Sequence, residues 1–302
     1  MRMPAAEDPQ GIFCPRKAPD AADAGCIGKP GNAAGAEKTR GADPPGGLKR
    51  SQGPPTLWRD LRRHTAARVA LGRVGEGLPT AAHLDFQEAH ARARDAVHSA
   101  LDLPALTTAI GRPTLAVQSA APDRRSYLLR PDLGRRLADG EAARIEAVRA
   151  PGSFLFVVAD GLSASGVQAM APPLIAAAAP MLEAAGLTLA PMVIATQGRV
   201  ALGDAIGAAM GARIVAVLIG ERPGLSAQDS MGIYLTLDPR PGRTDAERNC
   251  ISNIRAGGMS PEEAAAKLLW LAGAALRLGA TGVALKDEQA VTLSAPPPPP
   301  LR

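Results

Sequence analysis

The sequence predicts an α/β fold in which a Rossmann-like parallel sheet carries helices on both faces. In the second half of the chain, short continuous apolar runs alternate with longer segments of helical periodicity, which is the pattern of buried parallel strands and their crossover helices. The chain has 302 residues, which is long enough to bury a sizeable core. Because aromatic residues make up only 3%, that core has to be built from Ala, Leu, Val and Ile.

The elements of the second half can be placed in chain order. Residues 154–159 form the first predicted strand, a continuous apolar run. A helix is expected over 167–185, and its prolines Pro172, Pro173 and Pro180 should kink or divide it. The remaining predicted elements are a strand at 189–195, a helix at 200–211, and strands at 214–219 and 232–237.

The last predicted helix is marked at both ends. Ser260 is a suitable N-cap, Pro261 suits the first turn, and Glu263 completes a capping box with the serine. Gly279 favours a left-handed stop at the C-terminal end. We therefore expect one helix between Ser260 and Gly279.

The first half of the chain has a different character. Residues 1–56 contain nine prolines and nine glycines and few large apolar side chains, so they are predicted to form a disordered extension. Apolar residues then recur at helical spacing over 57–69 and 81–101, and one short strand is possible at 127–129. The predicted segments are the extension 1–56, a mostly helical subdomain 57–150, a Rossmann-like domain 151–290 and a Pro-rich tail 291–302.

Composition excludes several classes of protein. The formal net charge is +5, from 34 basic and 29 acidic residues, which is too small for a dedicated nucleic-acid binder. Three cysteines cannot form a disulfide framework. No apolar run approaches the ~20 residues that span a bilayer, and no secretory signal is recognised. We therefore expect a cytoplasmic protein that binds neither membrane nor nucleic acid.

Ligands of open α/β sheets bind beyond the carboxyl ends of the strands. No glycine fingerprint of a dinucleotide or P-loop site follows any predicted strand. Asp160 and Ser163 follow the first strand, and each either lines a ligand pocket or holds a structural turn. All four histidines precede residue 151, so the predicted sheet domain has no histidine to act as a base or metal ligand.

Cys250 is the one cysteine of the predicted folded part, and no histidine lies near it in the sequence. A zinc site or a Cys–His nucleophile is therefore disfavoured, and the plainest interpretation of Cys250 is a small buried hydrophobic residue. The residues alone indicate a small-molecule-binding α/β domain with weak evidence for catalysis of its own.

Six blocks of the sequence, in the same order as in the family, resemble the small subunit of ethanolamine ammonia-lyase. The pair GERPGL and CISNI is the most specific part of this similarity. The blocks are LRRHTAARVALGR (61–73), YLLRPDLGRRL (127–137), VADGLSASG (158–166), QGRVALGDAIG (197–207), IGERPGL (219–225) and CISNIRAGG (250–258).

The resemblance implies a lyase complex that converts ethanolamine to acetaldehyde and ammonia, with adenosylcobalamin as the radical source. This chain would be its non-catalytic subunit. The partner would be a large subunit, a TIM barrel that holds the substrate, with cobalamin bound between the two chains. The family's small-subunit contacts to cobalamin correspond here to Val200, Glu221 and Cys250.

The missing histidine agrees with this interpretation. The sequence lacks DxHxxG, the motif in which a protein histidine replaces the lower base of the cofactor, so cobalamin would keep its own base on cobalt. A cofactor that carries the radical chemistry also explains why no general base is found. Six arginines in the resembling blocks either contact the partner or form a solvated face: Arg62, Arg63, Arg68, Arg130, Arg135 and Arg136.

Two other classes of function stay open. The chain could be a stand-alone corrinoid or nucleotide carrier without lyase activity. An independent α/β enzyme is disfavoured, because it needs a base, a nucleophile or a glycine fingerprint. The family's N-terminal end can also address the enzyme to a bacterial microcompartment, usually through a short amphipathic helix, and residues 1–56 show none.

Overall fold

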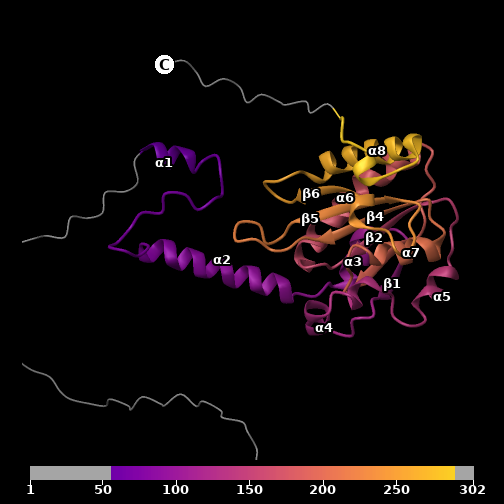
Figure 1. Cartoon of the computed structure of the whole chain (residues 1–302), viewed down its shortest axis with the longest axis horizontal. Coiled ribbons are helices and arrows are strands. Elements are labelled where there is room, and N and C mark those ends of the chain that lie inside the picture. The colour runs from indigo at the N-terminus through magenta and orange to yellow at the C-terminus, as the bar shows by residue number, and fades with distance from the viewer. Residues whose placement is uncertain (1–55, 290–302) are drawn as a thin grey trace, which may run out of the picture. The chain divides into compact units, whose positions relative to one another are not determined.

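A six-stranded sheet forms the centre of the computed structural model, which describes residues 56–289 (Figure 1). The predicted extension and Pro-rich tail therefore lie almost entirely outside the described residues. The strand order is β1-β3-β2-β4-β5-β6. The strands are β1 (Thr114–Gln118), β2 (Phe154–Ala159), β3 (Met192–Thr196), β4 (Ile214–Gly220), β5 (Met231–Leu237) and β6 (Asn249–Ile254).

The first four strands in this order run parallel, as the sequence predicts. β1 pairs with β3, β3 with β2, and β2 with β4, and each of these pairs is parallel. Helix α6 (Ala164–Ala184) makes the crossover from β2 to β3, and α7 (Leu202–Met210) makes the crossover from β3 to β4. The buried apolar runs predicted at 154–159 and 214–219 are both confirmed as strands.

The prediction of a wholly parallel sheet is wrong at one edge. β5 pairs antiparallel with β4, and β6 pairs antiparallel with β5. Only residues 221–230 join β4 to β5, and only 238–248 join β5 to β6. Links this short turn back as hairpins, because a parallel return needs a longer crossover that usually contains a helix. The sheet is mixed, and a Rossmann-like topology is not confirmed.

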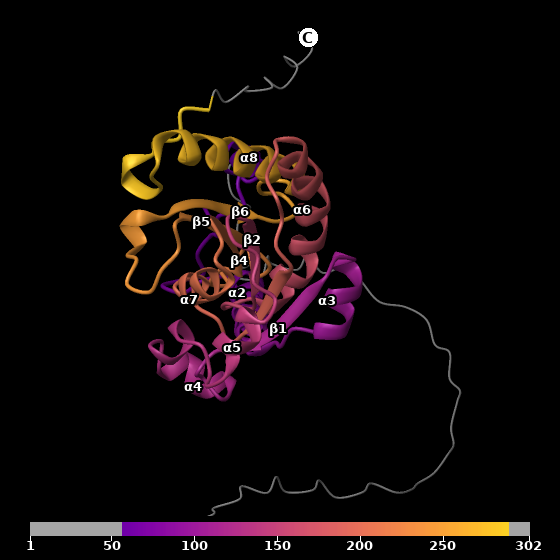
Figure 2. The ribbon, with the colours of Figure 1, turned by 90° about the vertical axis from the view of Figure 1, so that its right-hand side faces the viewer.

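Helices cover both faces of the sheet (Figure 2). α6 and the last helix, α8 (Pro261–Leu278), pack side by side over one face. α5 (Glu141–Glu146) and α7 lie on the other face. The other helices are α1 (Thr56–Leu61), α2 (Thr80–His98), α3 (Leu103–Ile110) and α4 (Arg124–Leu129), with 3-10 turns at Leu133–Arg135, Asp245–Glu247 and Gly282–Ala284.

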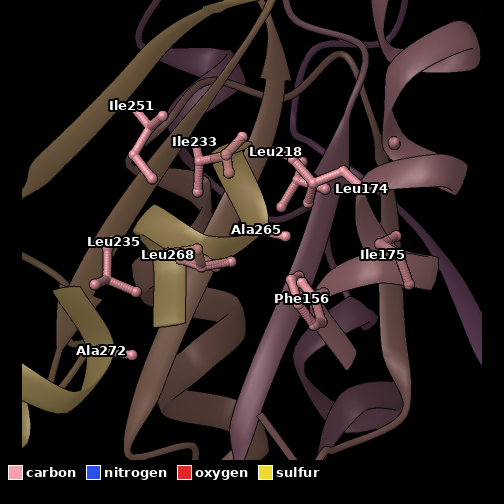
Figure 3. Close-up of a cluster of buried hydrophobic side chains, with 14 of the residues drawn as sticks. Phe156, Leu174, Ile175, Leu218, Ile233, Leu235, Ile251, Ala265, Leu268 and Ala272 are labelled. Carbon is pink, nitrogen blue, oxygen red and sulfur yellow. The ribbon is translucent and has the colours of Figure 1, made fainter. Parts of the chain in front are cut away.

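The strand β2 divides its side chains between two hydrophobic cores. Phe156 points into the core under α6 and α8, where Leu174, Ile233 and Leu268 also lie (Figure 3). Val157, its neighbour, points into the core under α7. This alternation is the period of two that a strand imposes, and both faces of β2 are fully buried. The carboxyl end of β2 is therefore held from both sides.

The ends of α8 are as predicted. The hydroxyl of Ser260 accepts from the amide of Glu263, and the Glu263 carboxylate accepts from the amide of Ser260 at 2.9 Å. Gly279 adopts φ +74° at the C-cap. Of the two outcomes predicted for the prolines, a kink or a division, the division does not occur, because α6 is one helix with all three prolines inside it. Its extensive burial against the sheet and α8 offsets the hydrogen bonds that the prolines remove.

Two predictions for the first half need correction. Residues 127–129 belong to the helix α4, and the strand of this half is β1, which joins the sheet. The predicted helix over 57–69 ends at Leu61, after which the Arg62 Nε donates to the carbonyl of Val69 at 2.9 Å. The predicted helix over 81–101 is confirmed as α2, yet large apolar side chains on it, Phe86 among them, are exposed.

Within residues 56–289, no helix is long and apolar enough to cross a membrane.

Candidate functional site

Two adjoining depressions lie beside the turn after β3. The smaller one opens where β2 and β4 end, and the larger one extends past Tyr234 of β5 to the loop before β6. Their volumes are about 430 Å³ and about 340 Å³. They share Arg199, Val200 and Tyr234, so they form one continuous surface, which we call the strand-end trough. Arg135 lines the larger depression and Glu221 the smaller one.

The turn after β3 is fixed by Asp160 at the end of β2. The Asp160 carboxylate accepts from the backbone N–H of Gln197 at 2.9 Å and of Gly198 at 3.0 Å. These bonds hold Gln197 in the left-handed region, at φ +55°, which non-glycine residues seldom adopt. The turn delivers Arg199 and Val200 into the trough. Of the two roles left open for Asp160, the geometry favours the structural one.

Burial raises the pKa of Asp160 above its ordinary value, against the opposing effect of the two N–H groups and of the Arg124 guanidinium. The Arg124 Nη1 lies 3.5 Å from the Asp160 Oδ2 and donates to the carbonyl of Gly161 at 2.8 Å. Asp160 is buried and both of its oxygens accept from its own chain, so a ligand cannot reach it for proton transfer.

Two arginines lie against the ring of Tyr127 beside this turn. The guanidinium carbons of Arg124 and Arg199 lie 4.7 Å and 4.1 Å from the centre of the Tyr127 ring. The buried Tyr127 hydroxyl donates to the carbonyl of Gly198 at 3.2 Å, and burial raises its pKa to about 12. The stack fixes Arg199, and the Arg199 Nε is buried with no hydrogen-bond partner among the described residues.

Ser163 holds a structural turn. Its hydroxyl donates to the carbonyl of Gln228 at 2.7 Å and caps α6 by accepting from the N–H of Gly166 at 3.3 Å. Because Ser163 is fully buried, a ligand cannot reach it. Its role is to fasten the start of α6 to the hairpin between β4 and β5.

Glu221 begins that hairpin and connects it to β6. Both of its carboxylate oxygens accept from the N–H of Asn253, at 3.2 and 3.3 Å. The side chain lies over Gly232, where an added Cβ would approach the Glu221 Oε1 to 3.0 Å. Each carboxylate oxygen keeps a further lone pair for a ligand in the smaller depression.

Cys250 lies on β6, directly opposite Tyr234 of β5. The prediction that Cys250 is a buried hydrophobic residue is wrong, because the side chain is exposed. β6 is the edge strand, and only Ile251 and Ile254 of its side chains are buried. Crowding by neighbouring protein atoms raises the pKa of the Cys250 thiol, and the Glu221 carboxylate raises it further.

The structure therefore places two of the three expected cofactor contacts in one depression, and the third lies next to a residue that lines it. Val200 and Glu221 line the smaller depression, and Cys250 borders Tyr234, which lines both. Sequence reasoning missed Tyr234, an intermediate residue in an otherwise buried strand. The signal in the sequence that could have identified it is a phenol inside the apolar run of this strand, MGIYLTL.

The exposed thiol allows a direct test of this local geometry. In a variant with Cys14 and Cys26 replaced by serine, we expect a disulfide reagent to label Cys250 without denaturant. The midpoint of the rate against pH should lie above that of a cysteine in an unstructured peptide, because the thiolate is disfavoured. Glu221→Gln should move that midpoint to lower pH, since it removes a nearby negative charge. Labelling that requires unfolding, or a shift to higher pH, would contradict the geometry.

The sequence also matches known proteins. The family model described as "Ethanolamine ammonia-lyase light chain" matches residues 55–286. A relative from Bradyrhizobium diazoefficiens is 54% identical over 241 residues, which cover 78% of this chain and 92% of the relative. A relative from Rhodopseudomonas palustris is 53% identical over 234 residues, covering 76% and 90%. One from Pseudomonas syringae pv. tomato is 51% identical over 242 residues, covering 78% and 84%. All three relatives are named ethanolamine ammonia-lyase small subunit.

Proposed function

Since the chain belongs to the ethanolamine ammonia-lyase small-subunit family, we propose that it holds one side of adenosylcobalamin at the interface with a large subunit. The name small subunit implies such a partner. The large subunit would be a TIM barrel that holds the substrate, and the assembled enzyme would convert ethanolamine to acetaldehyde and ammonia. The chain is then a subunit of a lyase complex without catalytic residues of its own.

One observation carries this proposal: Val200, Glu221 and Tyr234 line one trough, with Cys250 beside Tyr234. The trough is open and partly apolar, which suits a corrin ring with an apolar rim and projecting amides. Glu221 can accept hydrogen bonds from such amides, whereas Val200 and Cys250 offer apolar contact.

The titratable groups of the trough suit binding better than catalysis. Adenosylcobalamin supplies a carbon radical when its cobalt–carbon bond breaks. Burial raises the pKa of Tyr234, as of Tyr127, to about 12, so both phenols stay protonated near neutral pH. The raised pKa of Cys250 likewise keeps its thiol protonated. These groups can orient a cofactor and exclude water, and the proton transfers to substrate are assigned to the partner chain.

We assign the surface for the large subunit to the segment 57–150. Trp58, Leu84 and Phe86 are large apolar side chains exposed on α1 and α2. Apolar side chains of this size, clustered in one segment, are typical of a protein interface. The exposed arginines Arg62 and Arg63, next to α1, would form the polar rim. Delivery to a microcompartment would depend on residues 1–56, which lie outside the described residues except for Thr56.

Replacing Glu221 with Ala is expected to weaken adenosylcobalamin binding to the two-chain complex about tenfold, by removing charge-assisted hydrogen bonds. Glu221→Gln keeps an acceptor and should lose less. Cofactor binding is measured by absorbance titration, and the fold is checked by circular dichroism. Glu262→Ala, an exposed acid in the first turn of α8, is the matched control. Unchanged affinity in both Glu221 variants would contradict the assignment.

A further inference from the structure

The larger depression of the trough brings two arginines together from separate parts of the chain. The backbone N–H of Arg199 donates to the carbonyl of Gly134 at 2.8 Å. Arg135, the next residue along, therefore lies on the same depression as Arg199. This backbone hydrogen bond joins the 3-10 turn at Leu133–Arg135 to the turn after β3. The two arginines are therefore held near each other by the main chain.

Neither of these arginines is neutralised within residues 56–289, where no carboxylate lies within 4.0 Å of Arg135 or Arg199. The third arginine of the depression, Arg243, is already paired with Glu247. The one acid in the lining, Asp245, lies 3.4 Å from a different arginine, Arg248.

The charges around the depression leave one positive charge in excess. The arginines of the lining, together with Arg248, carry four guanidinium groups. Three carboxylates oppose them: Asp245 in the lining, Glu247 paired with Arg243, and Asp204 paired with Arg248. Arg135 and Arg199 line one hollow without a carboxylate partner, so their positive charges repel each other and attract an anion. The preferred ligand of this depression is therefore an anionic group with a single negative charge.

The backbone adds donors at the same place. Val200 and Ala201 line the depression immediately before α7, and no side chain caps this helix. The N–H groups of Leu202 and Gly203 turn back to the carbonyls of Arg199 and Val200. Among the described residues, the N–H groups of Val200 and Ala201 have no such acceptor. An uncapped helix start next to two arginines favours an oxyanion.

We propose that this depression binds the phosphodiester in the nucleotide loop of cobalamin, through Arg135, Arg199 and the start of α7. The proposal rests on the proposed function. A phosphodiester carries one negative charge, which matches the excess positive charge. The exposed Arg135 guanidinium can bind phosphate oxygens with paired hydrogen bonds, and Arg199, whose Nη2 donates to the carbonyl of Tyr127 at 3.1 Å, adds its positive charge. Because the two depressions share Arg199, Val200 and Tyr234, one ligand can place its ring in one and its phosphate in the other.

Three corrinoids separate the contribution of the phosphate from that of the ring. Adenosylcobalamin has the full nucleotide loop, adenosylcobinamide phosphate keeps a phosphate without the lower base, and adenosylcobinamide has neither. Each is titrated by absorbance into the two-chain complex carrying the wild-type chain, Arg135→Gln or Arg136→Gln. Arg136 is the matched control, because it is also exposed but pairs with Asp132 at 3.6 Å and does not line the depression.

Arg135→Gln should weaken binding of the two phosphate-bearing corrinoids about tenfold and change binding of adenosylcobinamide less than about twofold. Arg136→Gln should leave all three affinities unchanged. An equal loss for all three corrinoids, or no loss for any, would overturn the proposal. The titrations are repeated with inorganic phosphate as a competitor. If Arg135→Gln reduces only the inhibition by inorganic phosphate and leaves the affinities for the corrinoids unchanged, the depression is a free-phosphate site and the proposal is also overturned. A wild-type complex that binds no corrinoid would instead contradict the proposed function.

Discussion

Replacing Asp204 with Ala should lower the free energy of unfolding by about 3–5 kcal/mol, because it leaves a buried guanidinium without its counter-charge. The side chains of Asp204 and Arg248 are 2% and 1% exposed. Their two hydrogen bonds measure 2.6 and 2.7 Å. Arg248 also donates to the Thr236 hydroxyl and to the carbonyl of Arg243, so the pair connects α7, β5 and the start of β6.

Urea unfolding of the purified chain measures this loss. Asp245→Ala is the matched control: Asp245 also contacts Arg248, but it is 90% exposed, and its removal should cost less than about 1 kcal/mol. Replacing both partners, Asp204→Leu with Arg248→Met, should recover most of the lost stability, since no charge is then buried alone. If Asp204→Ala destabilised no more than Asp245→Ala, the pair would not have the structural role assigned to it.

Replacing Gly220 with Ala should lower the free energy of unfolding by about 3 kcal/mol or more, because the new methyl group has no space. An added Cβ would lie 2.2 Å from the carbonyl oxygen of Ser163 and 2.5 Å from that of Asp160. Both neighbours are backbone atoms, so no side-chain rotation relieves the overlap. The variant should also separate the ends of β2 and β4 and so disrupt the smaller depression.

Gly224→Ala in the same hairpin is the control for Gly220→Ala. The nearest atom to its added Cβ is the carbonyl oxygen of Ala227, at an ordinary contact distance of 3.6 Å. Its unfolding free energy should stay the same or rise by up to about 1 kcal/mol, because alanine restricts the unfolded chain. Equal urea midpoints for the two variants would show that the close approach at Gly220 is not rigid.

The sequence predicted the parts of the fold that carry local signals. Continuous apolar runs identified β2 and β4, and cap residues identified α8. β1 and β6 were missed because they lie at the edges of the sheet and are only partly buried, so neither reads as an apolar run. The antiparallel direction of β5 is set by the short loop that joins it to β4. The apolar pattern of the strand carries no information about its direction.

The trough was predicted less completely than the fold. Its position at the strand ends follows from the order of strands and helices, and the resemblance supplied Val200, Glu221 and Cys250 as expected contacts. The stack of Arg199 on Tyr127 could not be predicted, because it depends on a left-handed turn at Gln197 that Asp160 imposes from a neighbouring strand. The exposure of Cys250 likewise follows from the edge position of β6.

The most direct test of the account measures acetaldehyde release from ethanolamine by this chain co-expressed with the large subunit. The assay is run with and without adenosylcobalamin, and with each chain alone. We expect the two chains to co-purify and acetaldehyde to form only when both chains and the cofactor are present. Two chains that do not associate, or a large subunit equally active without this chain, would contradict the account.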